Sequence, residues 1–264
     1  MEKEGIYLLP VLFEYGAFTV YAWGFTLSLA ILLGTVVAVR LARGIGMEPD
    51  RILDLVIVLV VGGVVGARLF YVLVYEPERY LQEPLQIFAI WKGGLVYYGA
   101  LIGGFIAGTW YVIRKKLPFW SLADLVSPPL ALGYGIVRLG CFMNGCCYGK
   151  ETESFIGVVF PYIEGAPCPD LIARYPTQLF SSAIGFLLFG VLMFVWNRKK
   201  FDGQVFLLFL ILYGIGRSIV ESFRENLLVF GNVTVSQLVS AVIIVAAVVF
   251  YRLRSQQKRH GGGE

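Results

Sequence analysis

Residues 55–75 read LVIVLVVGGVVGARLFYVLVY, an apolar run that is interrupted by a single charged residue, Arg68. An α-helix needs about 20 apolar residues to cross the roughly 30 Å hydrocarbon core of a bilayer. A charged side chain at that depth is costly, and it faces the interior of a helix bundle or a water-filled cavity. The run therefore predicts a membrane-spanning helix whose arginine points into such a bundle or cavity.

The whole chain shares this apolar character. Its 264 residues are 58% hydrophobic and 15% charged, with a mean hydropathy of +0.74, whereas soluble domains average about 25% charged residues. Such a composition excludes a disordered chain, a coiled coil and an ordinary cytosolic enzyme. The net charge of +4, without a basic stretch interleaved with aromatic residues, excludes a nucleic-acid partner. We expect an all-α, polytopic membrane protein in which residues 1–264 form a single domain.

Long apolar windows recur along the chain and end at charged residues. Each window reaches or approaches the length of about 20 residues that a bilayer requires. We therefore predict seven transmembrane helices, which correspond to residues 16–39, 55–75, 93–113, 125–137, 175–197, 204–216 and 226–251.

The Lys and Arg residues between these windows predict the orientation. Thirteen of the 22 Lys and Arg residues lie in one set of connections and six in the opposite set. Because cytoplasmic loops are enriched in basic residues, we expect the N-terminus outside and the C-terminus in the cytoplasm. Residues of about 145–174 then form an extracytoplasmic loop, and about 252–264 form a cytoplasmic tail. The acidic N-terminal residues and Pro10 argue against a cleavable signal peptide.

Three arginines belong to the predicted spans: Arg68 interrupts its apolar window, and the windows at 125–137 and 204–216 run into Arg138 and Arg217. Each needs a partner at that depth. Tyr213, Arg217 and Glu221 are spaced i, i+4, i+8, so they line one helix face. This pattern fits a structural Arg–Glu pair, and it also fits a site for an anionic headgroup in which Glu221 holds the guanidinium in place. For Arg68, the candidate partners are a lipid phosphate or Glu221.

Arg138 precedes a glycine-punctuated stretch, residues 139–150, at the end of the fourth predicted span. The glycines allow tight turns and a close approach of the backbone to a ligand, and the planar guanidinium of arginine matches a phosphate. The stretch is consistent with a site for a lipid headgroup. It is also consistent with a glycine-rich helix exit beside a snorkelling arginine.

Four cysteines, Cys141, Cys146, Cys147 and Cys168, lie on or near the predicted outer side. Their spacing fits the paired pattern of zinc sites poorly, so we predict no metal ion and no cofactor. A disulfide between Cys168 and Cys146 or Cys147 is consistent with an oxidising exterior, and packed free thiols are the alternative. The single histidine, His260, lies in the tail, which excludes a Cys–His or Ser–His–Asp relay.

Several ordered motifs resemble those of the prolipoprotein diacylglyceryl transferases, and together they extend along nearly the whole chain. Residues 137–145, VRLGCFMNG, resemble the family signature G-R-x-G-N-F-x-N-G-E. The other matching segments are residues 21–24, 66–73, 91–95 with 99–103, 175–180, 213–217 with 221–225, and 236–240. The family's seven spans and exterior N-terminus agree with the topology predicted above.

The resemblance implies an enzyme of the bacterial inner membrane. Such an enzyme transfers the diacylglyceryl group of phosphatidylglycerol to the lipobox cysteine of a prolipoprotein signal peptide and releases glycerol phosphate. By this resemblance Arg138 binds the headgroup and Arg217 supports the reaction, while Tyr98 stands at the position of a catalytic histidine. Further substrate-binding candidates are Arg68, Tyr71, Asn144, Gly149, Tyr213 and Glu221. Arginines in a dry cavity suit the negative charge that develops on a departing phosphate.

Three residues depart from the family pattern. Tyr98 replaces the histidine, Cys141 replaces the first asparagine of the signature, and Cys146 replaces its glutamate. Because tyrosine has a pKa near 10, it is a poor base at neutral pH. Lost activity, a changed acceptor and a mechanism that relies on the arginines alone therefore all stay open.

Two other functions are alternatives. A paralogue that binds anionic phospholipid without chemistry, or that acts on an altered substrate, is motivated by the Tyr98 and Cys141 replacements. A small transporter is motivated by the three arginines within spans. Transporters often show paired short or broken spans in two corresponding halves, and this sequence lacks them.

Overall fold

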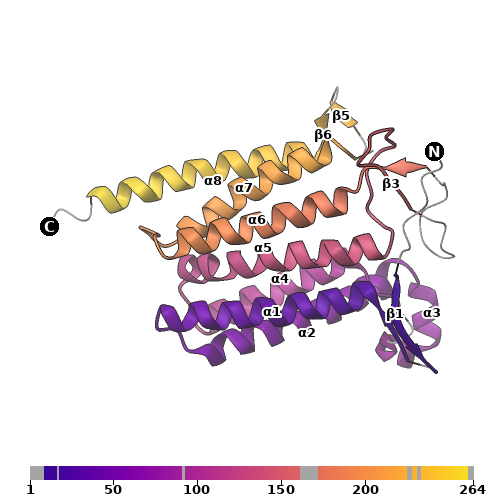
Figure 1. Ribbon diagram of the computed structural model, residues 1–264. Helices are drawn as coiled ribbons and strands as arrows, with labels where there is room; N and C mark the ends of the chain where they lie inside the picture. The colour runs from indigo at the N-terminus through magenta and orange to yellow at the C-terminus, as the bar shows by residue number, and fades with distance from the viewer. Residues whose placement is uncertain are drawn as a thin grey trace. The chain divides into compact units, whose positions relative to one another are not determined.

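The computed structural model describes residues 9–16, 18–90, 93–160, 172–224, 228–230 and 233–260. Within those ranges, long helices account for most of the chain (Figure 1). They are α1 (Ala22–Gly44), α2 (Pro49–Val74), α4 (Tyr97–Arg114), α5 (Phe119–Met143), α6 (Thr177–Trp196), α7 (Gln204–Glu221) and α8 (Val235–His260). The all-α class predicted from the composition is confirmed.

Short elements lie between the long helices. The helix α3 (Pro77–Gln82) and the 3-10 helix η1 (Pro84–Phe88) connect α2 to α4. Among the described residues, short strands form three antiparallel pairs: β1 (Val11–Tyr15) with β2 (Phe18–Tyr21), β3 (Val158–Val159) with β4 (Ala173–Arg174), and β5 (Leu228–Phe230) with β6 (Val233–Thr234). The sequence does not predict these pairs, because strands of two to five residues are too short to show an alternating pattern.

In the described part of the chain, six helices are long and apolar enough to cross a membrane: α1, α2, α5, α6, α7 and α8. Each corresponds to one of the predicted spans, although the bounds differ. The predicted span at 226–251 becomes α8, which begins later because β5 and β6 precede it. The remaining predicted span, at 93–113, corresponds to α4, whose 18 residues include several glycines and tyrosines that lower its mean hydropathy. A seventh crossing by α4 stays a prediction.

The chain divides into two compact units. One comprises residues 1–38 and 123–264, and the other comprises residues 39–122. The first unit holds Arg138 and Arg217, and the second holds Arg68. That residues 1–264 form a single domain stays a prediction.

In the unit of residues 39–122, α2 and α4 pack closely through glycines. A Cβ atom at Gly66 would overlap the Gly99 carbonyl oxygen, and a Cβ atom at Gly103 would overlap the Gly62 carbonyl oxygen. Small residues at such positions let two helix backbones approach each other. The glycine-rich segment at 99–104 is therefore a helix-packing surface.

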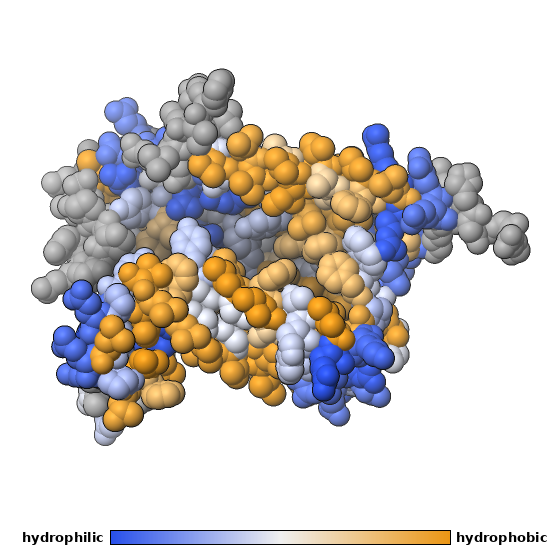
Figure 2. Space-filling model, turned by 180° about the vertical axis from the view of Figure 1, so that it is seen from behind, coloured by the Kyte–Doolittle hydropathy of each residue, from blue (hydrophilic) through white to orange (hydrophobic). Residues whose placement is uncertain are grey.

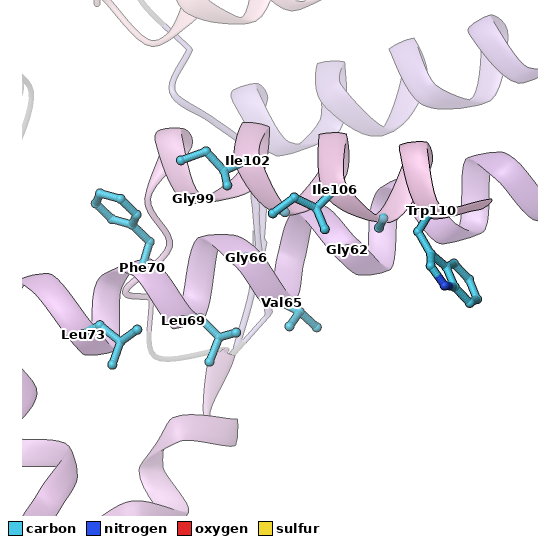
Figure 3. A pocket seen from close by; sticks show the side chains of 12 residues that line it. Gly62, Val65, Gly66, Leu69, Phe70, Leu73, Gly99, Ile102, Ile106 and Trp110 are labelled. Atoms are coloured by element: carbon cyan, nitrogen blue, oxygen red, sulfur yellow. The ribbon is translucent and has the colours of Figure 1, made fainter. Parts of the chain in front are cut away.

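An apolar groove runs beside this contact (Figure 3). Its volume is about 540 Å³, and its walls include Leu69 and Phe70 of α2 and Ile102, Ile106 and Trp110 of α4. Glycine or apolar residues form the whole lining. Hydrocarbon therefore fits the groove better than water does.

In the other unit, α1, α5, α6, α7 and α8 pack in this order. Gly140 of α5 lies against Thr26 of α1, and Gly135 of α5 lies against Gly185 of α6. Further contacts join α6 to α7 and α7 to α8. In this unit, α5 carries Arg138 and α7 carries Arg217, and both helices pack against α6.

A buried carboxylate joins α5 to the start of α7. Asp124 is fully buried, and its oxygens accept hydrogen bonds from the backbone N–H groups of Gly203 and Phe206, each at 2.9 Å. Lys199 forms an ion pair with the same carboxylate at 3.1 Å. Because a helix N-terminus favours negative charge, Asp124 holds the beginning of α7 against α5.

The flanks of the helices are apolar at their surface. Figure 2 shows apolar residues along the helices and hydrophilic residues gathered toward helix ends. Phe105 of α4 and Val242 and Val245 of α8 are examples of strongly exposed apolar side chains. Exposed apolar surface on this scale suits lipid rather than water.

We predict that Gly103→Ala destabilises the unit of residues 39–122, whereas Gly104→Ala does not. A methyl group at residue 103 would overlap backbone atoms of α2, while one at residue 104 would make ordinary contact with the Leu59 carbonyl oxygen at 3.6 Å. Overpacking of this kind costs about 1–3 kcal/mol. Thermal unfolding of the two variants in detergent measures the difference, and equal melting temperatures would contradict the helix contact described above.

Candidate functional site

Arg138 lies near the end of α5 and is half-buried. Its guanidinium carbon lies 5.1 Å from the centroid of the Tyr134 ring, one turn earlier on the same helix. Among the described residues, no carboxylate or carbonyl oxygen forms a hydrogen bond or an ion pair with this guanidinium. An aromatic face attracts a cation but offers no acceptor for its N–H groups. The donors of Arg138 are therefore available to an anionic ligand.

Arg217 lies on α7 and has a carboxylate partner. Its Nη1 forms an ion pair with Glu221 Oε2 at 2.5 Å, and the side chain of Glu221 is only 1% exposed. Its Nη2 donates a hydrogen bond to the Ser236 hydroxyl of α8 at 3.2 Å. The pairing of Arg217 with Glu221 that the i, i+4 spacing predicted is confirmed.

Two tyrosines connect these arginines. The rings of Tyr134 on α5 and Tyr213 on α7 meet edge to face, with centroids 5.4 Å apart. Tyr134 lies one turn before Arg138, and Tyr213 lies one turn before Arg217. The two guanidinium groups therefore belong to neighbouring helices at the same level of this unit.

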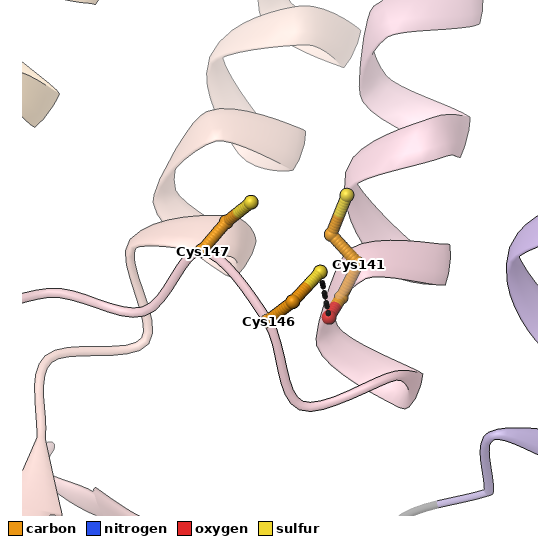
Figure 4. A group of neighbouring side chains, drawn as sticks. All are labelled: Cys141, Cys146 and Cys147. Atoms are coloured by element: carbon orange, nitrogen blue, oxygen red, sulfur yellow. Dashed lines mark hydrogen bonds between the residues drawn. The ribbon is translucent and has the colours of Figure 1, made fainter. Parts of the chain in front are cut away.

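At the end of α5 the chain turns back, and this turn, residues 144–149, is called the cysteine turn below. It brings Cys146 and Cys147 close to Cys141, which lies on the last turns of α5. Gly145 and Cys147 both have a left-handed backbone, with φ of +65° and +64°. The Sγ atoms of Cys141, Cys146 and Cys147 lie within 4.8 Å of one another (Figure 4). Hydrogen bonds with the Cys141 and Cys146 thiols, together with the nearby Arg138 guanidinium, hold the pKa of Cys147 well below its usual range.

These three cysteines are free thiols. Cys168, the fourth cysteine and the predicted disulfide partner, lies outside the described residues. The linear spacing of the cysteines predicts no metal site, because it does not show that the turn brings all three sulfur atoms together.

The start of α6 holds the cysteine turn in place. Gln178 Nε2 donates a hydrogen bond to the Cys146 carbonyl oxygen at 2.7 Å, and the Thr177 hydroxyl donates one to the Cys147 carbonyl oxygen at 2.8 Å. Gln178 is fully buried, and its Oε1 has no hydrogen-bond partner in the described part of the chain. The sequence analysis did not select Thr177 and Gln178 as site residues, although two polar residues at the start of an apolar span were a usable signal.

Asn144 and Gly149 also belong to this turn. The Asn144 side chain is within hydrogen-bonding reach of the Cys146 thiol. Gly149 is buried, its N–H donates a hydrogen bond to the Tyr175 carbonyl oxygen at 2.8 Å, and a Cβ atom there would overlap the Phe223 carbonyl oxygen. Gly149 therefore allows the loop to pass close to the end of α7.

In the other unit, backbone carbonyl groups surround Arg68. Its guanidinium donates hydrogen bonds at 2.6–3.5 Å to the carbonyl oxygens of Gln86, Ile87, Ala89, Gly93 and Gly94. These partners differ from the lipid phosphate or Glu221 that the sequence suggested. Neutral acceptors satisfy its N–H donors, so Arg68 organises the segment between α3 and α4.

Tyr71 and Tyr98 lie in the same unit as Arg68. The Tyr71 hydroxyl donates a hydrogen bond to Glu76 Oε1 at 2.9 Å. Hydrogen bonds from Arg79 and Tyr71 lower the pKa of Glu76. Tyr98, in the first turn of α4, is exposed, and its ring meets that of Tyr97 edge to face.

These features define a polytopic membrane protein that carries arginines in its apolar helices, one of which, Arg138, faces no acceptor among the described residues. The chain belongs to the prolipoprotein diacylglyceryl transferase family, because the family's model matches residues 10–253. This assignment confirms the resemblance seen in the motifs.

Curated relatives match nearly the full length of the chain. A phosphatidylglycerol–prolipoprotein diacylglyceryl transferase of Clostridium perfringens is 34% identical over 255 residues, covering 96% of this chain and 98% of that protein. The enzyme of the same name from Clostridium tetani is 35% identical over 253 residues, covering 95% and 99%. That from Geobacter sulfurreducens is 36% identical over 219 residues, covering 82% of each chain.

We predict that Glu221→Leu alone strongly destabilises the protein, because it leaves the Arg217 charge without its carboxylate. Breaking a buried ion pair on one side costs about 3–5 kcal/mol, whereas replacing both partners with apolar residues is often neutral. The double variant Arg217→Met with Glu221→Leu should therefore regain most of the lost stability. Denaturation in detergent measures both variants, and additive losses would show that the two side chains act independently.

We also predict that Cys147 is alkylated at a rate that changes little between pH 8 and pH 6. A thiol with an ordinary pKa of about 8.5 loses about tenfold in thiolate per pH unit below that value, while a lowered pKa keeps Cys147 ionised. Iodoacetamide labelling followed by peptide mass spectrometry measures the rate, with Cys147→Ser to identify the labelled peptide. A tenfold fall per pH unit would mean that the thiol is protonated at neutral pH.

Proposed function

We propose that this protein transfers the diacylglyceryl group of phosphatidylglycerol to the lipobox cysteine of a prolipoprotein. Family membership and full-length relatives that bear this name support the proposal. The structural observation that carries it is the guanidinium of Arg138, which faces no acceptor among the described residues. The same match favours the enzyme over a paralogue that only binds lipid.

In this reaction the acceptor thiolate attacks the glycerol carbon that is bonded to the phosphate ester oxygen. A carbon–sulfur bond forms, the carbon–oxygen bond breaks, and glycerol phosphate leaves with the electron pair. Negative charge grows on the departing phosphate, and preorganised donors in a dry site stabilise such charge. The fork of Arg138 binds the phosphate, and Arg217, held by Glu221, supports the developing charge.

The remaining site residues take supporting parts in this proposal. Asn144 and Gly149 shape the turn beside Arg138, and Tyr213 aligns the α7 face toward Tyr134. In the other unit, Arg68 and Tyr71 organise the segment between α3 and α4. Tyr98, which occupies the position of the family's histidine, lies at the start of α4 in that same unit.

We further propose that the protein lies in the bacterial inner membrane with its N-terminus outside and its C-terminus in the cytoplasm. The excess of Lys and Arg in one set of connections supports this orientation. The end of α5 and the cysteine turn then lie at the outer leaflet, where the phospholipid and the prolipoprotein cysteine meet.

We predict that Arg138→Ala lowers the transfer rate by about 10²–10³-fold, the loss seen when one charge-stabilising donor is removed. Arg138→Lys should retain more activity than Arg138→Ala, because it keeps the charge and loses the fork. The assay uses vesicles with phosphatidylglycerol labelled in its acyl chains, and it measures the mass added to a lipobox peptide.

The matched control is Arg198→Ala. Arg198 lies beyond the end of α6, with its guanidinium carbon 3.9 Å from the centroid of the Phe194 ring. The Arg198→Ala variant should leave transfer unchanged. All variants are compared by thermal unfolding. Wild-type transfer by Arg138→Ala would remove Arg138 from the mechanism, and the absence of transfer by folded wild-type protein would overturn the proposed function.

A further inference from the structure

The three sulfur atoms of Cys141, Cys146 and Cys147 have the separations of a metal-binding set. All three lie within 4.8 Å of one another. Three sulfur ligands at the zinc–sulfur distance of about 2.3 Å stand about 4 Å apart. Side-chain rotations that shift the sulfur atoms by less than about 1 Å therefore close the trio around one ion.

The backbone holds this arrangement at a cost. Cys147 adopts a left-handed φ of +64°, which a residue with a side chain rarely takes. Hydrogen bonds from Gln178 and Thr177 hold the turn, and both of these residues are buried. In Figure 4 the Cys141 side chain extends from helix α5 and the Cys147 side chain from the following turn, toward the same space. Ligands fixed in advance by buried supporting residues are typical of binding sites.

Among the described residues, the three thiols are also the whole ligand set of this group. Among the described residues, no histidine, aspartate or glutamate adds a fourth ligand to the group. Zinc sites with three protein ligands keep their fourth position open for water or substrate, whereas purely structural sites have four. Three thiolates around a divalent ion leave one negative charge, which the neighbouring Arg138 balances.

We propose that Cys141, Cys146 and Cys147 bind a thiophilic divalent ion such as zinc, and that the open fourth position takes the acceptor thiol. The second half of this proposal rests on the proposed function. Soft thiolate ligands select such ions over magnesium or calcium. A thiol that coordinates the ion loses its proton, which passes to water.

The site would supply what the sequence lacks for thiol deprotonation. This chain has Tyr98 where its family has a histidine, and a phenol is a poor base at neutral pH. The coordinated thiolate attacks the glycerol carbon, the phosphate ester oxygen leaves with the bonding electrons, and the ion keeps its oxidation state. Arg138 and Cys141 are spaced i, i+3 on α5, so the phosphate and the thiolate would meet on one face of the helix.

The first experiment measures binding without reference to activity. Full-length protein in detergent, reduced with a phosphine, is titrated with Co²⁺, and thiolate-to-cobalt charge-transfer absorption is recorded. We expect one ion per chain. Each of Cys141→Ser, Cys146→Ser and Cys147→Ser should weaken binding by more than the about 10–100-fold that removal of a supporting residue costs.

Cys168→Ser is the matched control, and it should bind Co²⁺ as the wild type does. Thermal unfolding identifies any variant that fails to fold, and Cys146→Ser and Cys147→Ser, on half-buried residues, disturb packing less than Cys141→Ser on a buried one. Absent charge-transfer absorption, or a disulfide within the trio in protein taken from its membrane, would overturn the site. Loss of binding in Cys168→Ser would overturn the open fourth position.

The second experiment tests the acceptor. A lipobox peptide added to the Co²⁺ protein should change the cobalt spectrum, whereas the same peptide with serine in place of cysteine should not. An unchanged spectrum would overturn the fourth ligand. Full transfer activity after removal of zinc with a chelator would refute the metal's role and leave the proposed function intact. Binding without any transfer would refute the proposed function and leave the site intact.

Discussion

A charge inside an apolar medium must find a partner, and this requirement organises both units of the protein. The chain meets it in three ways. Backbone carbonyl groups surround Arg68, and Glu221 pairs with Arg217. Arg138 lies over the Tyr134 ring, which attracts the charge without accepting hydrogen bonds. The first two arginines therefore have partners within the protein, while the donors of the third face no acceptor among the described residues.

Glycine makes these arrangements possible by letting backbones approach each other. At Gly94 a Cβ atom would overlap the Arg68 guanidinium, so the carbonyl groups reach that arginine only because no side chain intervenes. Gly149 allows the cysteine turn to pass beside the carbonyl group of Phe223. The high glycine content of the chain is thus connected to its polar chemistry as well as to helix packing.

The departures from the family signature gain a common meaning in three dimensions. Cys141 and Cys146 replace an asparagine and a glutamate of the signature, and together with Cys147 they form one cluster next to Arg138. Tyr98, which by the resemblance stands at the position of a histidine, lies in the other unit. Under the proposed metal site, soft thiol ligands take the place of a polar pair and activate the acceptor thiol, and Arg138 stays to bind the phosphate.

The sequence by itself determined the membrane class, the helical fold, the pairing of Arg217 with Glu221 and the family, because length, hydropathy and i, i+4 spacing are local properties of the chain. Only the tertiary structure decided which partners Arg68 and Arg138 have and that three cysteines meet. The carbonyl groups around Arg68 lie 18–26 residues away in sequence, and Gln178 reaches the Cys146 carbonyl group across 32 residues. Backbone acceptors carry no sequence signature, since every residue has one. For the same reason, a turn that depends on a left-handed cysteine becomes visible only after the chain has folded.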